Sequence, residues 1–146
     1  DSYITADSKQ RDASFHNTGL YNIGAQGLHP AGGEGVAEVT GKLADMGSFR
    51  APSLRNVAAT APYFHDGSAA TLDAALDHYQ AGGRTIAAGP NAGDGSQNPR
   101  KNSLIGGFPL SASERADVVA FLESLTDETF LHDPAFGDPF VTEGAR

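Results

Sequence analysis

The chain has 146 residues, which suits one domain, and its 18 Asp and Glu residues outnumber its 10 Lys and Arg residues. The resulting net charge of -8, with no basic cluster, disfavours nucleic acid as a partner. Leu, Ile, Val and Phe together supply 29 residues, a share near the limit below which chains struggle to fold alone. No apolar run approaches the roughly 18 residues of a membrane span. We therefore expect one domain, without a membrane span, whose core needs apolar material from outside.

The residue types and their spacing disfavour several common chemistries. Cysteine is absent, which excludes disulfides, thiolate metal sites and any cofactor attached to this chain through thioether links. The five histidines lack the His-x-x-x-His spacing that places two imidazoles on one helical face, and no Gly-x-Ser-x-Gly elbow occurs. A mononuclear zinc site and hydrolase chemistry are therefore disfavoured. The sequence starts at Asp1 without a signal segment, which is typical of a processed chain or a fragment.

The first half of the chain is rich in turn residues and predicts little regular structure. Between Asp1 and Gly47 many glycines interrupt every periodic pattern. We expect short extended segments at residues 14–20 and at residues 36–40, the second because it carries three β-branched residues. A short helix is expected at residues 53–59, ended by Pro62.

Two amphipathic helices are predicted in the second half. The first begins after the N-cap Thr71 and ends at Gly82, and its apolar positions recur with helical spacing, so Tyr79 should face inward. The second begins with the capping box of Ser111 and Glu114 and ends near Thr126. The apolar stripes consist of Leu72, Ala75, Leu76 and Tyr79 in the first helix and Val118, Phe121, Leu122 and Leu125 in the second.

The segments that flank the second helix contain few periodic residues. Residues 82–108 are polar and rich in Gly, Asn and Pro, which predicts a surface or functional loop. The tail from Thr129 to Arg146 is expected to be an extended strap that packs aromatic side chains onto the domain. The apolar residues of this strap are Phe130, Leu131, Phe136 and Phe140.

The segment from Gly47 to Gly67 concentrates aromatic side chains, prolines and two arginines. Arg50 and Arg55 beside these aromatics suit a clamp for an anionic planar ligand, because guanidinium groups bind carboxylates in a forked geometry. In the alternative interpretation the arginines pair with local acids and the aromatics fill the core. The spacing alone favours neither. The aromatic residues concerned are Phe49, Tyr63 and Phe64.

Several motifs occur in one order along the chain. They are Phe15-His-Asn-Thr-Gly-Leu20, Phe49-Arg-Ala-Pro-Ser-Leu-Arg-Asn56, Thr60-Ala-Pro-Tyr-Phe-His-Asp-Gly-Ser68, Thr71-Leu72 and the segment from Leu110 to Thr126. Together they resemble the C-terminal haem domain of bacterial dihaem cytochrome c peroxidases and their MauG-type relatives, from about Phe15 to Thr126. The resemblance implies an all-α, loop-rich, cytochrome c-like domain with short extended segments. Residues 1–14 would form an upstream connector and residues 127–146 the C-terminal strap.

The resemblance also implies roles for individual residues. The backbone carbonyls of Thr60 and Pro62 would bind calcium, an ion that prefers oxygen ligands. Tyr79 would be an axial ligand of the haem iron, a position held by methionine in other peroxidases of the family and by tyrosine in MauG-type enzymes. Arg50 and Arg55 are candidate partners of the haem propionates. His65 would lie at the haem edge, and Tyr63, Phe64, Leu72 and Leu76 would contact the porphyrin.

One departure from the family pattern is the absence of its Cys-x-x-Cys-His haem-attachment motif. In one interpretation, the haem c and its proximal ligand belong to an upstream, haem-bearing portion of the same periplasmic protein. That protein would use hydrogen peroxide to oxidise a protein substrate, or would accept electrons from a donor. In the alternative interpretation, the chain is a haem-free module that binds calcium or a partner protein. Tyr79 would then be a core tyrosine.

Overall fold

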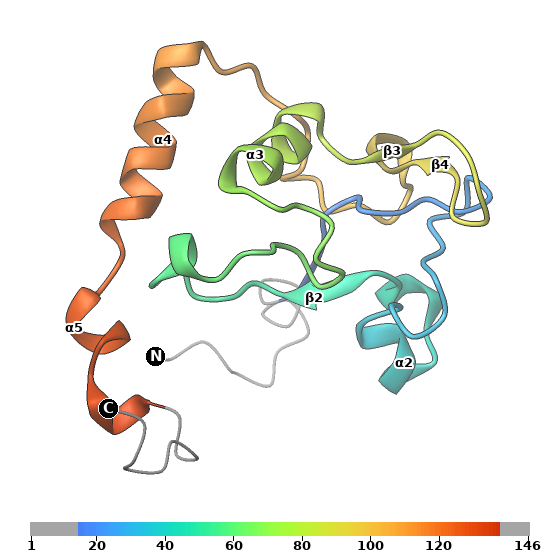
Figure 1. The fold of residues 1–146 in the computed structure, drawn as a ribbon. Coiled ribbons are helices and arrows are strands. Elements are labelled where there is room, and N and C mark those ends of the chain that lie inside the picture. The colour runs from blue at the N-terminus through green and yellow to red at the C-terminus, as the bar shows by residue number, and fades with distance from the viewer. Residues whose placement is uncertain (1–14, 138–146) are drawn as a thin grey trace.

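The computed structural model describes residues 15–137, so the expected connector at residues 1–14 and Phe140 lie outside the described part. Short elements alternate with long loops, and only two helices exceed five residues. Helix α4 and helix α5 stand to one side of a body that contains the other elements (Figure 1). The elements are β1 (Phe15–Asn17), α2 (Val36–Thr40), β2 (Ser48–Arg50), α3 (Leu72–Ala81), β3 (Thr85–Ile86), β4 (Gly93–Asp94), α4 (Ala112–Ser124) and α5 (Glu128–Leu131), with 3-10 helices at Leu43–Asp45, Val57–Ala59, Gly95–Gln97 and Pro134–Phe136.

The expectation of an all-α fold is wrong, although a loop-rich, cytochrome c-like domain agrees with the structure. Two small antiparallel sheets lie in the body, one formed by β1 and β2 and the other by β3 and β4. Phe15 lies opposite Arg50 in the first sheet, and Thr85 lies opposite Asp94 in the second. The second sheet falls within residues 82–108, where the sequence predicted only loop, because pairs of two-residue strands leave no alternating apolar pattern.

The extended segment expected at residues 36–40 is instead helix α2. Gly35 precedes it at φ 66°, and Gly41 ends it in the left-handed conformation at φ 64°. The amide of Gly41 donates to the carbonyl of Ala37, which closes the last turn. Val39 remains 89% exposed, so its β-branched side chain joins no sheet. The glycines at both ends therefore outweigh the β propensity of the residues between them.

The helix expected at residues 53–59 is reduced to the 3-10 turn Val57–Ala59. Asn56 adopts the left-handed conformation at φ 57°, which prevents the helix from starting earlier. This conformation serves a long-range contact: the amide of Asn56 donates to the carbonyl of Leu125 at 3.0 Å, and its side-chain oxygen accepts from the amide of Asp127 at 2.6 Å. The contact with the end of α4 therefore stabilises a left-handed Asn56 at the position where the sequence predicted a helix.

The buried part of the body is held mainly by polar contacts. Leu20 is 1% exposed and Asn17 is 2% exposed. The side chain of Asn17 donates to the carbonyl of Met46 at 2.8 Å and accepts from the amide of Gly19 at 2.8 Å. Buried Asn22 and Asn98 connect backbone segments in the same way, through bonds to the carbonyls of Asp94 and Tyr21. Asparagine side chains thus organise loops that contain few apolar residues.

Helix α3 agrees with its prediction. The Thr71 hydroxyl accepts from the amide of Ala74 at 3.1 Å, and Gly82 at φ 71° ends the helix in the left-handed conformation. Leu76 and His78, two positions apart and therefore on different faces of the helix, are both buried. The helix therefore fixes the orientation of Tyr79, the residue that the resemblance singles out.

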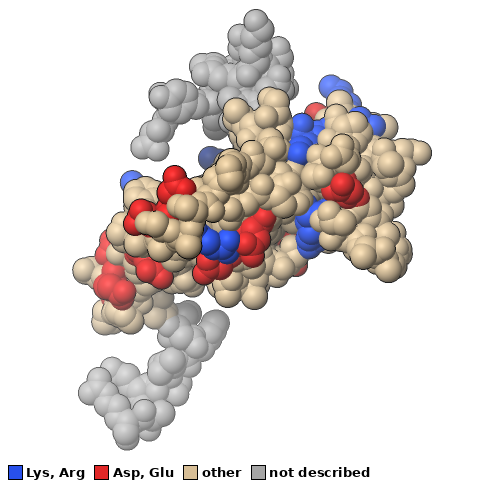
Figure 2. Space-filling model, turned by 90° about the horizontal axis from the view of Figure 1, so that it is seen from above, with Lys and Arg blue, Asp and Glu red and all other residues tan. Residues whose placement is uncertain are grey.

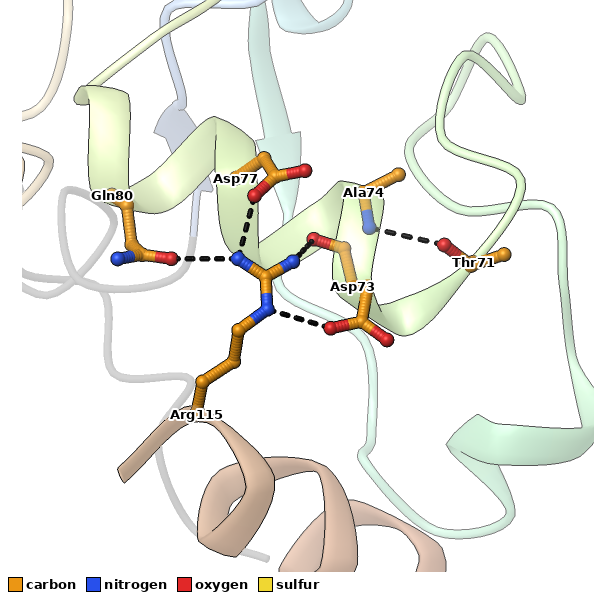
Figure 3. A network of polar contacts seen from close by, with 6 residues as sticks. All are labelled: Thr71, Asp73, Ala74, Asp77, Gln80 and Arg115. Carbon is orange, nitrogen blue, oxygen red and sulfur yellow. Dashed lines mark hydrogen bonds and ion pairs between the residues drawn. The ribbon is translucent and has the colours of Figure 1, made fainter. Parts of the chain in front are cut away.

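Helix α4 begins at the predicted capping box but buries none of its residues. Its first turns are joined to α3 by Arg115, whose guanidinium contacts Asp73 and Asp77 at 2.6 Å and Gln80 at 2.9 Å (Figure 3). Phe121, in the predicted apolar stripe, is 58% exposed. Seen from above, acidic side chains predominate over the α4 side of the molecule (Figure 2). The helix is thus held at its ends and leaves apolar side chains uncovered.

The described part of the C-terminal tail is helical and not extended as predicted. Asp127 caps α5 by accepting from the amide of Phe130 at 3.0 Å. The rings of Phe130 and Phe136 contact each other at 4.7 Å between centroids, yet the two side chains are 48% and 65% exposed. None of the helices between residues 15 and 137 has the length and apolar character that crossing a bilayer requires.

Replacing Thr71 tests how much the N-cap contributes to α3. Thr71→Ala should lower the free energy of unfolding by about 1 kcal/mol, because the amide of Ala74 loses its acceptor. Urea unfolding followed by circular dichroism measures the change. Thr71→Ser keeps the hydroxyl and should retain most of the stability. An equal loss in both variants would contradict the capping role.

Candidate functional site

The candidate site forms where the loop at residues 60–69 meets helix α3. The loop is closed by the antiparallel pairing of Tyr63 with Ala69, in which the amide of Tyr63 donates to the carbonyl of Ala69 at 2.7 Å. Phe64 lies at the start of this loop in the left-handed conformation, at φ 65°. Its ring lies 4.6 Å from that of His78 and 6.0 Å from that of Tyr79, measured between centroids. A tight turn thereby places Phe64 against two consecutive residues of α3.

Tyr79 carries a phenol that is partly removed from water without a polar partner. Its hydroxyl makes no hydrogen bond to the residues described, and burial raises its pKa above the ordinary value. Leu76, three residues earlier on the helix, is 8% exposed, and Leu72 is half-buried. The residue is half-buried, and its hydroxyl is not among the buried polar atoms that lack a partner. Tyr79 therefore offers a phenol oxygen, without a partner among the described residues, beside an apolar helix face.

His78 is a site residue that the sequence analysis missed. Its Nε2–H donates to the carbonyl of Thr18 at 2.9 Å, which leaves Nδ1 as an unprotonated, buried acceptor without a partner among the residues described. Burial lowers the pKa of the imidazole, so the ring is neutral at pH 7. Phe64 and His78 line a surface hollow of about 250 Å³ together with Ala74, Asp77 and Arg84. The Thr18 contact anchors α3 to the loop after β1.

His65 belongs to a second aromatic group, built around Tyr21. The His65 ring stacks on Phe49 with 3.7 Å between centroids, and it lies 6.1 Å from His29 and 6.5 Å from Tyr21. Burial lowers the pKa of His65. His29 is 6% exposed, and neither of its ring nitrogens has a hydrogen-bond partner among the described residues. Burial lowers the pKa of His29 to about 4.

Tyr21, Asp66 and Arg84 form a polar group that the sequence did not reveal. The Tyr21 hydroxyl donates to Oδ2 of Asp66 at 2.7 Å, and the Arg84 guanidinium contacts the same oxygen at 3.2 Å. Hydrogen bonds from Ser68 and Tyr21 contribute, with the charge of Arg84, to a lowered pKa of Asp66 although burial acts in the opposite direction. The only sequence signal was the Asp66-Gly67 turn, because the three residues are distant along the chain.

The other predicted residues are not gathered around Tyr79 by any described contact. Arg50 ends β2 and Arg55 precedes the 3-10 turn; both are exposed, and neither forms an ion pair with a residue between 15 and 137. Tyr63 uses its hydroxyl to donate to the carbonyl of Val57 at 3.0 Å. The backbone of Thr60 and Pro62 is exposed. Within the described residues, no three His, Asp or Glu side chains are arranged to hold a metal ion.

Several large apolar side chains of the described residues remain exposed. Leu54, close in sequence to the turn that contacts α4, is 49% exposed, and Phe121 on α4 is 58% exposed. Phe108, whose amide donates to the carbonyl of Gln80 on α3, is 46% exposed. These side chains are accessible for contact with another group.

Comparisons with known proteins agree with this architecture. The family model for RoxA-like, cytochrome c-like proteins matches residues 48–81. The cytochrome-c peroxidase IdrP1 of Denitromonas iodatirespirans is 38% identical over 68% of this chain, and the methylamine utilization protein MauG of Methylorubrum extorquens is 35% identical over 80%. The crystal structure of a MauG-like protein associated with microbial copper homeostasis matches 86% of this chain with a TM-score of 0.82 and 55% identity. The chain belongs to the dihaem cytochrome c peroxidase and MauG family.

The chain corresponds to only part of its relatives. It spans 24% of the IdrP1 sequence, 28% of the MauG sequence and 36% of the MauG-like structure. The residues present fit one side of a haem, because Tyr79 offers an unpaired oxygen donor and Leu76 and Phe64 offer apolar contacts. Without cysteine, the chain offers no thioether anchor. The residues present could therefore supply one axial ligand and apolar contacts on one side of a haem, but not its covalent attachment.

The buried His29 makes stability depend on pH. The unfolded histidine titrates near its ordinary pKa of 6.5 and the folded one near a pKa of about 4, so between these values the unfolded state binds more protons. The free energy of unfolding should therefore fall by up to about 3 kcal/mol on acidification from pH 7 to pH 4 through His29 alone. The lowered pKa values of His65 and His78 act in the same direction.

Urea unfolding at a series of pH values checks this dependence. His29→Gln should flatten the slope of stability against pH between pH 6.5 and pH 4. His132→Gln, at an exposed position, serves as the matched control and should keep the slope of the unsubstituted protein. A slope that His29→Gln leaves unchanged would rule out His29 as its source.

Proposed function

We propose that this chain is the C-terminal haem-binding part of a periplasmic dihaem peroxidase of MauG type. The whole protein would use hydrogen peroxide to oxidise a protein substrate by long-range electron transfer. Family membership and the identity of the relatives as cytochrome-c peroxidases and MauG support a haem-dependent, peroxidase-type oxidoreductase. The observation that carries the proposal is the unpaired phenol of Tyr79 at the helix position where the family binds iron.

The environment of Tyr79 suits coordination to an oxidised metal. Burial disfavours the phenolate in the protein alone, which is why the pKa of Tyr79 is raised. Tyr79 would bind a trivalent iron as the phenolate, because the positive charge of the metal would reverse this preference. An anionic oxygen ligand stabilises oxidised iron better than a neutral thioether does, so it lowers the reduction potential. Tyr79 thus favours oxidation of a substrate over peroxide removal fed by a small electron donor.

The remaining haem contacts are proposed from the resemblance to the family. Phe64, Leu72 and Leu76 would cover one face of the porphyrin, and His65 would lie at its edge. Arg50 and Arg55 carry exposed guanidinium groups that are free of ion pairs within residues 15–137, so they remain available to haem propionates. Tyr63 acts by holding the loop, since its hydroxyl is already bonded to Val57.

The haem c attachment and the proximal ligand would come from a haem-bearing portion of the same protein outside these 146 residues. The short span of the chain relative to its relatives supports this arrangement. The uncovered Phe121 on α4 supports it as well, because another packed portion would bury this side chain. Haem and this second portion together would provide the apolar contacts that the composition lacks.

The absence of cysteine favours a second candidate, a haem-free module that binds calcium or a partner protein. A visible spectrum of the purified protein that contains this chain separates the two. A Soret band with retained iron supports the peroxidase. A colourless, folded protein supports the haem-free module and overturns the proposed haem site.

The ligand assignment predicts a specific spectral change. Tyr79→Phe should alter the absorption and electron paramagnetic resonance spectra of one haem, because the iron loses its phenolate oxygen. Iron content should stay the same, since the thioether anchors are elsewhere. Tyr3→Phe is the matched control and should leave both spectra unchanged, because no haem contact is proposed for Tyr3. Identical spectra for Tyr79→Phe and the unsubstituted protein would show that Tyr79 is not a ligand.

Calcium is proposed to bind the backbone carbonyls of Thr60 and Pro62. Neither carbonyl accepts a hydrogen bond from a described residue, and both residues are exposed. Removing calcium with a chelator should change the haem spectrum, and calcium should restore it. Magnesium should not, because it dehydrates reluctantly and demands stricter octahedral geometry. A haem protein that retains no calcium after gel filtration and keeps its spectrum would contradict this site.

A further inference from the structure

The three tyrosines in the described part of the chain differ in what their hydroxyls contact. Tyr21 donates to the carboxylate of Asp66 at 2.7 Å, whereas Tyr63 donates to the backbone carbonyl of Val57 at 3.0 Å. Tyr79 has no partner among the described residues. A carboxylate can take up a proton, whereas a backbone carbonyl is far too weak a base to do so. Among the described tyrosines, Tyr21 is therefore the one whose hydroxyl donates to a group that can accept its proton.

The surroundings of Tyr21 couple the loss of an electron to the loss of that proton. The guanidinium carbon of Arg84 lies 4.5 Å from the centre of the Tyr21 ring. A positive charge at this distance disfavours any form of the ring that is itself positive. Arg84 is fixed there by its bonds to Oδ2 of Asp66 at 3.2 Å and to the carbonyl of Leu20 at 3.2 Å. An oxidised Tyr21 can thus persist only after its proton has moved to Asp66.

The same turn connects Tyr21 to the candidate haem wall. Asp66 follows Phe64 by two residues, and the Phe64 ring lies 6.0 Å from that of Tyr79. Between them, His65 lies 6.5 Å from Tyr21, centroid to centroid. Tyr21 itself is half-buried, and the side chains of Asp66 and Arg84 are 18% and 25% exposed. Tyr21 is therefore partly accessible to solvent and is linked through residues 64–66 to the helix that carries the proposed iron ligand.

We propose that Tyr21 is a proton-coupled, one-electron relay between the protein substrate and the haem site. This inference rests on the proposed function. In the forward step, Tyr21 gives one electron to the peroxide-oxidised haem centre, and its phenolic proton moves to Oδ2 of Asp66. In the return step, the substrate gives one electron to the neutral tyrosyl radical, and the same proton moves back from Asp66. Each cycle carries one electron inward and leaves Tyr21 and Asp66 as they began.

The experiment uses the haem-loaded, full-length protein treated with hydrogen peroxide in the absence of substrate. Rapid freeze-quenching and electron paramagnetic resonance, with and without ring-deuterated tyrosine, identify any tyrosyl radical. We expect a tyrosyl signal that falls at least about tenfold in Tyr21→Phe and in Asp66→Asn, because the second variant keeps an acceptor oxygen but loses the base. Tyr3→Phe, the matched control at a tyrosine with no proposed role, should keep the signal.

The optical change of the haem on adding peroxide is recorded in the same samples. If the haem responds and Tyr21→Phe keeps the full tyrosyl signal, the relay is overturned while the proposed function stands. If the haem of the unsubstituted protein does not respond, the proposed function is overturned.

A second readout avoids peroxide altogether. Photochemical oxidation by a ruthenium polypyridyl complex should produce the phenoxyl absorption in the unsubstituted protein and much less in Tyr21→Phe. Equal yields in the two would overturn the relay.

Discussion

Buried hydrogen bonds between asparagine side chains and the backbone are the interaction on which the rest of this structure depends. Few apolar side chains are fully buried, and Leu20 is the largest of them. Asn17, Asn22 and Asn98 each donate to a carbonyl distant in sequence, and two of them also accept from the amide of a nearby glycine. A loop-rich chain must satisfy its buried backbone groups in this way, because it lacks the regular ladders of helices and sheets.

This polar framework fixes one half of the molecule much more firmly than the other. Helix α3 is anchored through His78 to the loop after β1, and it carries Tyr79 in a defined orientation. Helix α4 is joined to α3 by Arg115 and to the turn after β2 by Asn56, but it buries no residue of its own. Phe121 on α4 and Phe130 on α5 are uncovered, and haem and another portion of the protein are proposed to pack on this side. Haem binding would then complete the apolar core, so folding and retention of the cofactor would be coupled.

The chemistry of the three described tyrosines follows from their surroundings and not from their residue type. An unpaired oxygen in an apolar setting suits metal binding at Tyr79, and a bond to a backbone carbonyl makes Tyr63 structural. A carboxylate partner and a cation over the ring give Tyr21 the properties of a redox-active residue. One loop, at residues 60–69, supplies contacts to all three environments, so its conformation links the proposed ligand site to the proposed relay.

The sequence by itself determined the features that short-range interactions control. The Thr71 cap, the Gly82 end of α3 and the capping box of α4 were predicted because their partners lie within four residues. The family motifs likewise located Tyr79. The helix at residues 36–40, the left-handed Asn56 and the exposure of Phe121 were missed, since flanking glycines and tertiary contacts outweigh local propensity there. Only the tertiary structure brought Tyr21 to Asp66, 45 residues away, and both to Arg84. No local pattern encodes a contact that arises when separate loops fold against each other.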